Sequence, residues 1–77
     1  MGSYFFDVRY GAHFHPDQDG VEEEDDQAAV ERAVSLLAGQ IANRRSALDG
    51  SLAVEVRREK DRVATVSISI SKWPGDR

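Results

Sequence analysis

The side chains best suited to chemistry lie in one short segment near the N-terminus. His13 and His15 are two residues apart, so in an extended segment both imidazoles point to the same side. Asp17 or Asp19 could add a carboxylate oxygen, and such a set can hold Zn²⁺ or Ni²⁺. No third nitrogen or sulfur ligand accompanies the two histidines, so a surface turn that carries them is the favoured interpretation. We therefore predict neither a metal nor any other cofactor.

The segment from Asp17 to Asp26 is rich in carboxylates, which raises the question of a calcium site. A calcium loop needs its ligands, an internal glycine and a closing glutamate at fixed spacing, and this segment does not match that spacing. The sequence has no cysteine, no nucleophile elbow and no phosphate-binding glycine loop. We expect that the protein is not an enzyme.

A third kind of chemistry, contact with nucleic acid, would use basic and aromatic residues. The candidates are Phe5, Arg9, Arg44, Arg45, Arg57, Arg58, Lys60 and Arg62. The net charge is −4, so the gain from counterion release would be modest. Asp7 and Glu55 lie on the same predicted face as the arginines of their strands, which favours cross-strand ion pairs. A weak nucleic-acid-binding regulator is the alternative function, and it would use Arg9, Arg57, Arg58 and Arg62.

Charge is distributed unevenly along the chain. Residues 1–31 hold nine acidic side chains and one basic one, whereas residues 32–77 hold five and nine. Helix capping explains part of this asymmetry, because carboxylates suit the start of a helix and arginines suit its end.

No stretch approaches the roughly 20 apolar residues of a membrane span, and no basic segment followed by an apolar run opens the chain. We expect a cytoplasmic protein with no membrane contact.

These side chains must be positioned by one long amphipathic helix, expected over residues 25–46. Asp25 or Asp26 could accept a hydrogen bond from the first turn. The residues expected on the apolar stripe are Val30, Ala33, Val34, Leu37, Ala38 and Ile41. Gly39 inside the helix is interpreted as a close-packing position, and Gly50 lets the chain turn away after the helix. Such a helix is marginal alone, so its stripe must pack on strands.

Alternating apolar residues predict three strands, at 4–10, 51–58 and 62–72, with a turn or short strand at 11–23 and a tail at 73–77. Within 11–23, weak strand candidates lie at 12–15 and 21–23. The inward side chains are expected to be Tyr4, Phe6, Val8, Tyr10, Leu52, Val54, Val56, Ala64, Val66, Ile68 and Ile70. We therefore expect residues 1–77 to form one α+β domain of two layers, with the helix on a mainly antiparallel sheet of three or four strands (β-β-α-β-β).

The last strand also suggests association with another protein. It is long and regular, and it carries no charge between Thr65 and Ser71, as in an edge strand that nothing protects from pairing. A central position in the sheet is the alternative. The residues predicted to form an interface are Phe5, Thr65, Ser67, Ser69, Ser71 and Trp73. Regulatory protein binding or homodimerisation is the function that we predict, with nucleic acid a less favoured partner.

Several motifs together resemble one known family. They are Tyr4 to Arg9, the turn from Pro16 to Glu22, the helix start from Asp25 to Ala29, Val54 to Arg57, and Arg62-Val63. The family consists of short bacterial proteins, common in rhizobia and other alphaproteobacteria, and is classed as a domain of unknown function. The resemblance covers nearly the whole chain and implies a small intracellular α+β domain, but it identifies no catalytic or binding residue. In fold alone, the order of elements is also similar to antitoxins that bind a small RNase toxin.

Overall fold

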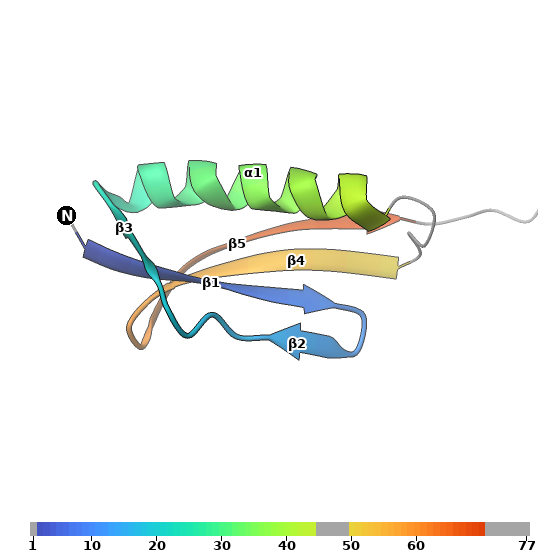
Figure 1. The fold of residues 1–77 in the computed structure, drawn as a ribbon, viewed down its shortest axis with the longest axis horizontal. Coiled ribbons are helices and arrows are strands. Elements are labelled where there is room, and N and C mark those ends of the chain that lie inside the picture. The colour runs from blue at the N-terminus through green and yellow to red at the C-terminus, as the bar shows by residue number, and fades with distance from the viewer. Residues whose placement is uncertain (1, 45–49, 71–77) are drawn as a thin grey trace, which may run out of the picture.

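The computed structural model describes residues 2–44 and 50–70, and it shows one helix lying on a five-stranded antiparallel sheet (Figure 1). The elements are β1 (Gly2–Tyr10), β2 (His13–His15), β3 (Val21–Glu23), α1 (Asp26–Arg44), β4 (Gly50–Arg58) and β5 (Asp61–Ile70). The α+β class and the helix-on-sheet arrangement are confirmed. Both weak candidate segments form strands, so the order is β-β-β-α-β-β and the sheet has five strands where we expected three or four.

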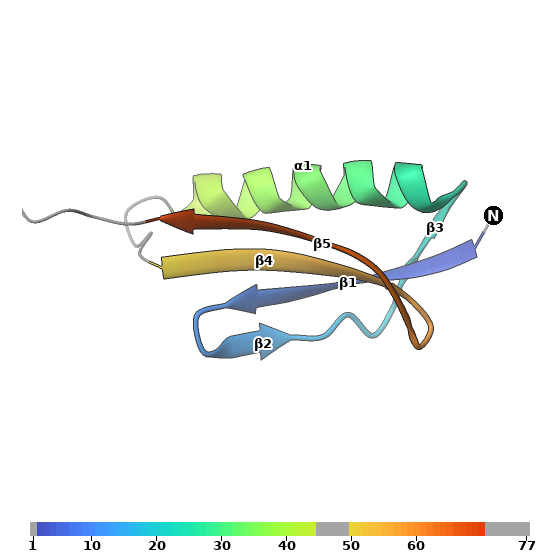
Figure 2. The same cartoon turned by 180° about the vertical axis from the view of Figure 1, so that it is seen from behind.

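The strands lie in the order β2-β1-β4-β5, and β3 pairs with the start of β1. Figure 2 shows the same order from behind, with α1 next to β5 and β4. In the middle of the sheet Val54 lies opposite Val8 on β1 and opposite Val66 on β5. Because opposed residues of antiparallel strands point to the same face, this row faces the helix as one layer.

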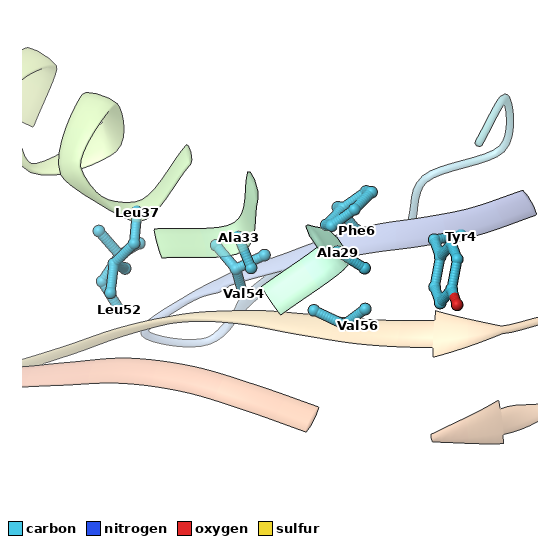
Figure 3. Packing of buried hydrophobic residues seen from close by; sticks show 8 residues of the cluster. All are labelled: Tyr4, Phe6, Ala29, Ala33, Leu37, Leu52, Val54 and Val56. Atoms are coloured by element: carbon cyan, nitrogen blue, oxygen red, sulfur yellow. The ribbon is translucent and has the colours of Figure 1, made fainter. Parts of the chain in front are cut away.

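The core lies between α1 and the three long strands (Figure 3). Its buried residues are Tyr4, Phe6, Ala29, Ala33, Leu37, Leu52, Val54 and Val56. Val8, Tyr10, Val66 and Ile68 pack against this cluster and are partly buried. The inward faces predicted for β1 and β4 are therefore confirmed, and so are the inward positions of Val66 and Ile68 on β5, since a strand period of two places alternate side chains on one face. Val63 also packs against the core, although it was not among the predicted inward residues.

The apolar stripe of the helix is narrower than we expected. Ala29, Ala33 and Leu37 are buried at steps of four residues, whereas Val34 is 50% exposed and Ala38 is exposed. The assignment of Val34 and Ala38 to the core was wrong. A single sheet contacts only one arc of a helix, and consecutive residues are about 100° apart, so Val34 lies beside the contact.

The helix begins as its sequence indicates. The carboxylate of Asp25 accepts the N–H of Ala28 at 2.8 Å, and its carbonyl accepts the N–H of Ala29 at 3.1 Å. Asp25 is therefore the N-cap residue. The helix is described to Arg44, so the rest of the predicted range, with Arg45, lies outside the described residues.

Gly39 does not serve close packing, contrary to our interpretation. It is exposed, and no heavy atom lies within 4 Å of a Cβ added there. Replacing Gly39 by alanine should therefore raise the free energy of unfolding by about 1 kcal/mol, because alanine loses less conformational freedom in a helix interior. Urea denaturation followed by circular dichroism would measure this. As a control, Gly50→Ala should destabilise, since Gly50 has a φ of 102°; a loss of stability in Gly39→Ala would contradict the prediction.

The two last strands are joined by a turn of two residues, Glu59 and Lys60, and Glu59 has a φ of 56°. One register shift between Val56 and Arg57 leaves Val63 as an extra residue on β5. The predicted tail, with Trp73, lies outside the described residues. Among the residues that are described, no helix has the length and apolar character that crossing a membrane requires.

Candidate functional site: the open edge and the charged face

The structure places β5 at the edge of the sheet. It is the last strand in the order, and within residues 2–44 and 50–70 no strand pairs with its outer side. From Ala64 to Ile70 it carries no charged residue. Alternate residues of an edge strand direct their N–H and C=O groups outward, where another strand can pair with them. Of the two positions that the sequence allowed, edge and centre, the edge is the observed one.

The opposite side of the sheet ends differently, in the short strands β2 and β3, which both pair with the outer side of β1. Residues 8–10 of β1 pair with β2, and residues 2–4 pair with β3. Between these two ladders, the Asp17 carboxylate accepts the N–H of Phe6 at 3.1 Å. A strand, a side chain and a second strand thus pair with successive parts of β1, and in the described chain β5 has no such cover.

We call residues 13–23, which lie along the outer side of β1, the covering segment, and Asp17 fixes its conformation. Its Oδ1 accepts the N–H groups of Asp19 at 3.0 Å and Gly20 at 3.2 Å, while its Oδ2 accepts that of Phe6. Desolvation raises the pKa of this carboxyl, but the three backbone hydrogen bonds and the nearby Arg57 outweigh desolvation and hold the pKa below its usual value. The ionised carboxylate is therefore the form that the fold stabilises.

This pKa shift predicts how Asp17→Asn depends on pH. Because the folded pKa lies below the unfolded value, the ionised side chain contributes stability above the unfolded pKa of about 3.9, and that contribution is lost as pH falls through the folded pKa. Near neutral pH the variant should be less stable by about 2 kcal/mol, since an amide N–H then faces backbone N–H groups. Urea denaturation at several pH values should show the difference shrinking below pH 4; a difference that stays constant would contradict the prediction.

The residues predicted to form an interface have different surroundings. Thr65, Ser67 and Ser69 lie exposed on β5, on the face turned away from α1. Phe5 is partly buried, and its ring lies 4.6 Å below the Arg57 guanidinium. Ser71 and Trp73 lie outside the described residues. The structure thus brings three of the six predicted residues together on the open strand.

One flank of the helix adds apolar surface beside this edge, which sequence reasoning missed by assigning Val34 to the core. Arg32 and Val34 lie on opposite sides of Ala33, which faces the sheet. Arg32 pairs with Glu23 of β3, and β3 pairs with β1. Val34 therefore lies on the β5 side of α1. The sequence could have indicated the exposure of Val34. Ala29, Ala33 and Leu37 recur every four residues and so lie on one side of the helix, and Val34 is about 100° away from Ala33.

The face of the sheet opposite α1, which we call the charged face, is organised around Arg57. Its Nε donates to Asp7 Oδ2 at 2.8 Å. Its Nη1 donates to the carbonyl of Glu59 at 2.8 Å, and its Nη2 donates to that of Asp17 at 3.1 Å. Asp7 is only 4% exposed and also accepts the N–H of Asp17 at 2.8 Å. This ion pair, whose carboxylate is buried and whose guanidinium is partly exposed, therefore links β1, β4 and the covering segment.

A second ion pair on the same face is exposed. Arg9 lies 3.3 Å from Glu55, and its guanidinium lies 4.6 Å above the ring of Phe14. The expected cross-strand ion pairs are thus confirmed for Arg9 and Arg57. Phe14, which sequence reasoning missed, is 43% exposed on β2.

The charged face contains a groove of about 280 Å³. Its lining residues are Asp7, Arg9, Phe14, Glu55, Val56, Arg57, Lys60 and Arg62. Four basic and two acidic side chains give the groove a charge of +2. Arg58 lies elsewhere, 3.1 Å from Asp26 at the start of α1, so the structure separates it from the other three arginines of the nucleic-acid hypothesis.

Most carboxylates between Asp17 and Asp26 bind groups of this chain. The observed pairs are Asp17 with the Phe6 N–H, Glu22 with Ser3, Glu23 with Arg32, Asp25 with the Ala28 N–H, and Asp26 with Tyr4 and Arg58. The hydrogen bond to Asp26, with burial, raises the pKa of the Tyr4 hydroxyl.

Among the residues described, no three histidine or carboxylate side chains gather where they could hold a metal ion. His13 and His15 are exposed on β2, whereas Asp17 is bound to β1.

A family model described as a domain of unknown function (DUF6894) matches residues 3–69. No curated protein and no solved structure matches the chain. The matched residues begin in β1 and end in β5, so they include both the open edge and the charged face.

Proposed function

We propose that this chain, which belongs to the family described as a domain of unknown function (DUF6894), is a binding module that pairs with another protein chain along the outer edge of β5. The observation that carries the proposal is the contrast between the outer side of β1, which other groups of the chain cover, and the outer side of β5, which no described strand covers. Three separate groups cover β1, namely β2, Asp17 and β3, whereas no described strand covers β5. Edge strands are commonly protected, and one left open and uncharged is suited to strand addition.

The surroundings of β5 support this role. Val66 and Ile68 face the core but are only partly buried, so an added strand could bury more of their apolar surface. Val34 extends the apolar surface onto the helix. On the other side of the strand, Thr65, Ser67 and Ser69 offer hydroxyl groups without charge repulsion. A regulatory protein, including one that holds a toxin as antitoxins do, could use such an edge.

A binding role also suits the titratable groups of the charged face better than catalysis does. Arg57 and Asp7 neutralise each other and join the covering segment to the sheet. Arg9 and Glu55 form a second pair. These contacts stabilise the fold, and we propose that the protein is not an enzyme.

Addition of a model strand tests the proposal. In two-dimensional NMR spectra, millimolar amounts of a short peptide of alternating threonine and valine should shift the amide resonances of β5, because backbone hydrogen bonds form along its outer edge. The amides of β2 serve as the internal control and should not move. A matched peptide with proline in place of each valine should shift neither strand, because half of its donors are missing. Unmoved β5 amides, in a chain that is also monomeric, would exclude the edge as a binding surface.

A second candidate function rests on the groove of the charged face, whose charge of +2 and exposed Phe14 could bind single-stranded nucleic acid. Lys60 and Arg62 would supply charge, because the arginines beside them already bind carboxylates. A gel shift with single-stranded RNA at low salt tests this candidate. Binding should weaken at least tenfold in Lys60→Ala/Arg62→Ala; absence of binding by the unmodified chain at low salt would exclude it.

A further inference from the structure

We infer that the partner of the β5 edge is a second copy of this chain, placed by a two-fold axis that passes beside Ser67. This inference rests on the proposed function and names the chain that would occupy the edge. In such a dimer the two β5 strands are antiparallel, and the two sheets become one continuous sheet. A two-fold interface requires that one surface be complementary to itself, and β5 meets that requirement.

The sequence of β5 determines the register. The uncharged segment of the sequence runs from Val63 to Ser71, between Arg62 and Lys72, and its midpoint is Ser67. Rotation about Ser67 places Ala64 opposite Ile70 and Val66 opposite Ile68 of the second copy. Within residues 64–70, every opposed pair then has the same character, apolar toward the helices or hydroxyl-bearing on the other face. The charged start of the strand, Asp61 and Arg62, remains outside the paired segment, so like charges do not meet within it.

The position of the helix fits the same arrangement. A two-fold axis perpendicular to the sheet places both helices on one face. α1 packs on both β4 and β5, and it lies toward β5 in Figures 1 and 2. A helix that lies above the space between its β4 and β5 is half a strand spacing away from β5. The two β5 strands of the dimer are one spacing apart, so the two helix axes are separated by two spacings of about 4.8 Å, or about 10 Å. Packed helices in proteins are separated by about 8 to 10 Å.

This geometry gives the exposed flank of α1 a partner. Val34 lies on the β5 side of the helix and is 50% exposed, so the two-fold axis brings it toward the same flank of the second helix. Leu36 is also apolar and 39% exposed, but it lies on the other side of Ala33 and thus away from the axis. The two residues therefore form a matched pair of probes, one inside the proposed interface and one outside it.

Cysteine cross-linking tests the register, and it is unambiguous because the chain has no cysteine of its own. Directly opposed residues of antiparallel strands have Cα atoms about 4.5 to 5.5 Å apart, within the range that a disulfide spans. Ser67→Cys should therefore form a disulfide-linked dimer on mild oxidation. Thr65→Cys or Ser69→Cys alone should not, because four residues of offset separate each from its own copy by about 14 Å. A mixture of those two variants should cross-link, since residues 65 and 69 are opposed.

Sedimentation equilibrium supplies the second readout. The unmodified chain should show a dimer whose population rises with concentration, Val34→Glu should raise the dissociation constant at least tenfold, and Leu36→Glu should leave it unchanged. Equal cross-linking of all three cysteine variants, or equal effects of the two glutamate variants, would overturn the proposed dimer. A strict monomer whose β5 amides still respond to the threonine and valine peptide would overturn the dimer but leave the edge proposal standing. A strict monomer with unresponsive β5 amides would overturn both.

Discussion

Replacing Arg57 by alanine is expected to lower the free energy of unfolding by about 3 kcal/mol, because it leaves the carboxylate of Asp7 buried without its counter-charge. Asp7 has a side chain that is 5% exposed, and Arg57 is its ion-pair partner in the described structure. The same substitution removes hydrogen bonds to the carbonyls of Asp17 and Glu59 and a cation–π contact with Phe5. A domain of this size is stabilised by only a few kcal/mol, so a large fraction of its stability depends on this side chain.

Arg9→Ala is the matched control for this prediction. Arg9 lies on the same face and pairs with Glu55, but its side chain is 49% exposed. Exposed pairs contribute less than about 1 kcal/mol, so Arg9→Ala should change the midpoint of urea denaturation only slightly. Equal losses in the two alanine variants would contradict the prediction. Replacing both partners of the buried pair, as in Asp7→Val/Arg57→Met, should recover part of the stability lost in Arg57→Ala, because no buried charge then remains.

Replacing Gly20 by alanine should also destabilise strongly, by about 3 kcal/mol, because two costs add. Gly20 has a φ of 79°, where a residue with a Cβ is strained by about 1 to 2 kcal/mol. A Cβ there would also lie 2.9 Å from Cε2 of Phe5, and moving that ring disturbs its contact with Arg57 at a further cost of about 1 to 3 kcal/mol.

Gly11→Ala separates these two costs. Gly11 has a φ of 57°, but nothing lies within 4 Å of a Cβ added there, so only the backbone cost of about 1 kcal/mol should remain. Thermal denaturation followed by circular dichroism would measure both variants. Similar losses in Gly11→Ala and Gly20→Ala would show that the contact with Phe5 does not matter.

The substitutions of Arg57 and Gly20 also affect the surface on which the proposed function depends. Arg57 and Gly20 hold the segment that covers β1, because Arg57 binds the carbonyl of Asp17 and Gly20 donates its N–H to the Asp17 carboxylate. Loosening this segment would leave β1 as a second open edge. We expect that partly destabilised variants associate through β1 as well, which is a reason to study β5 in variants that keep Arg57 and Gly20 intact.

The sequence by itself determined the elements and their buried faces. Leu52, Val54 and Val56 alternate with less buried residues, and this local period of two is sufficient to predict a strand and its inward side. Asp25 likewise marks the start of the helix through a hydrogen bond to a residue three positions away. Such features depend on neighbours in the sequence, so the sequence alone encodes them.

Only the tertiary structure decided which surfaces are closed and which are open. Asp7 and Arg57 are 50 residues apart in the chain, and no local pattern shows that they form a buried pair. Whether β5 is an edge or a central strand depends on the pairing of β1 with β4, and the exposure of Val34 depends on which arc of the helix the sheet contacts. Local periodicity specifies what each element buries, whereas long-range packing specifies which neighbour buries it and which edge remains available for another chain.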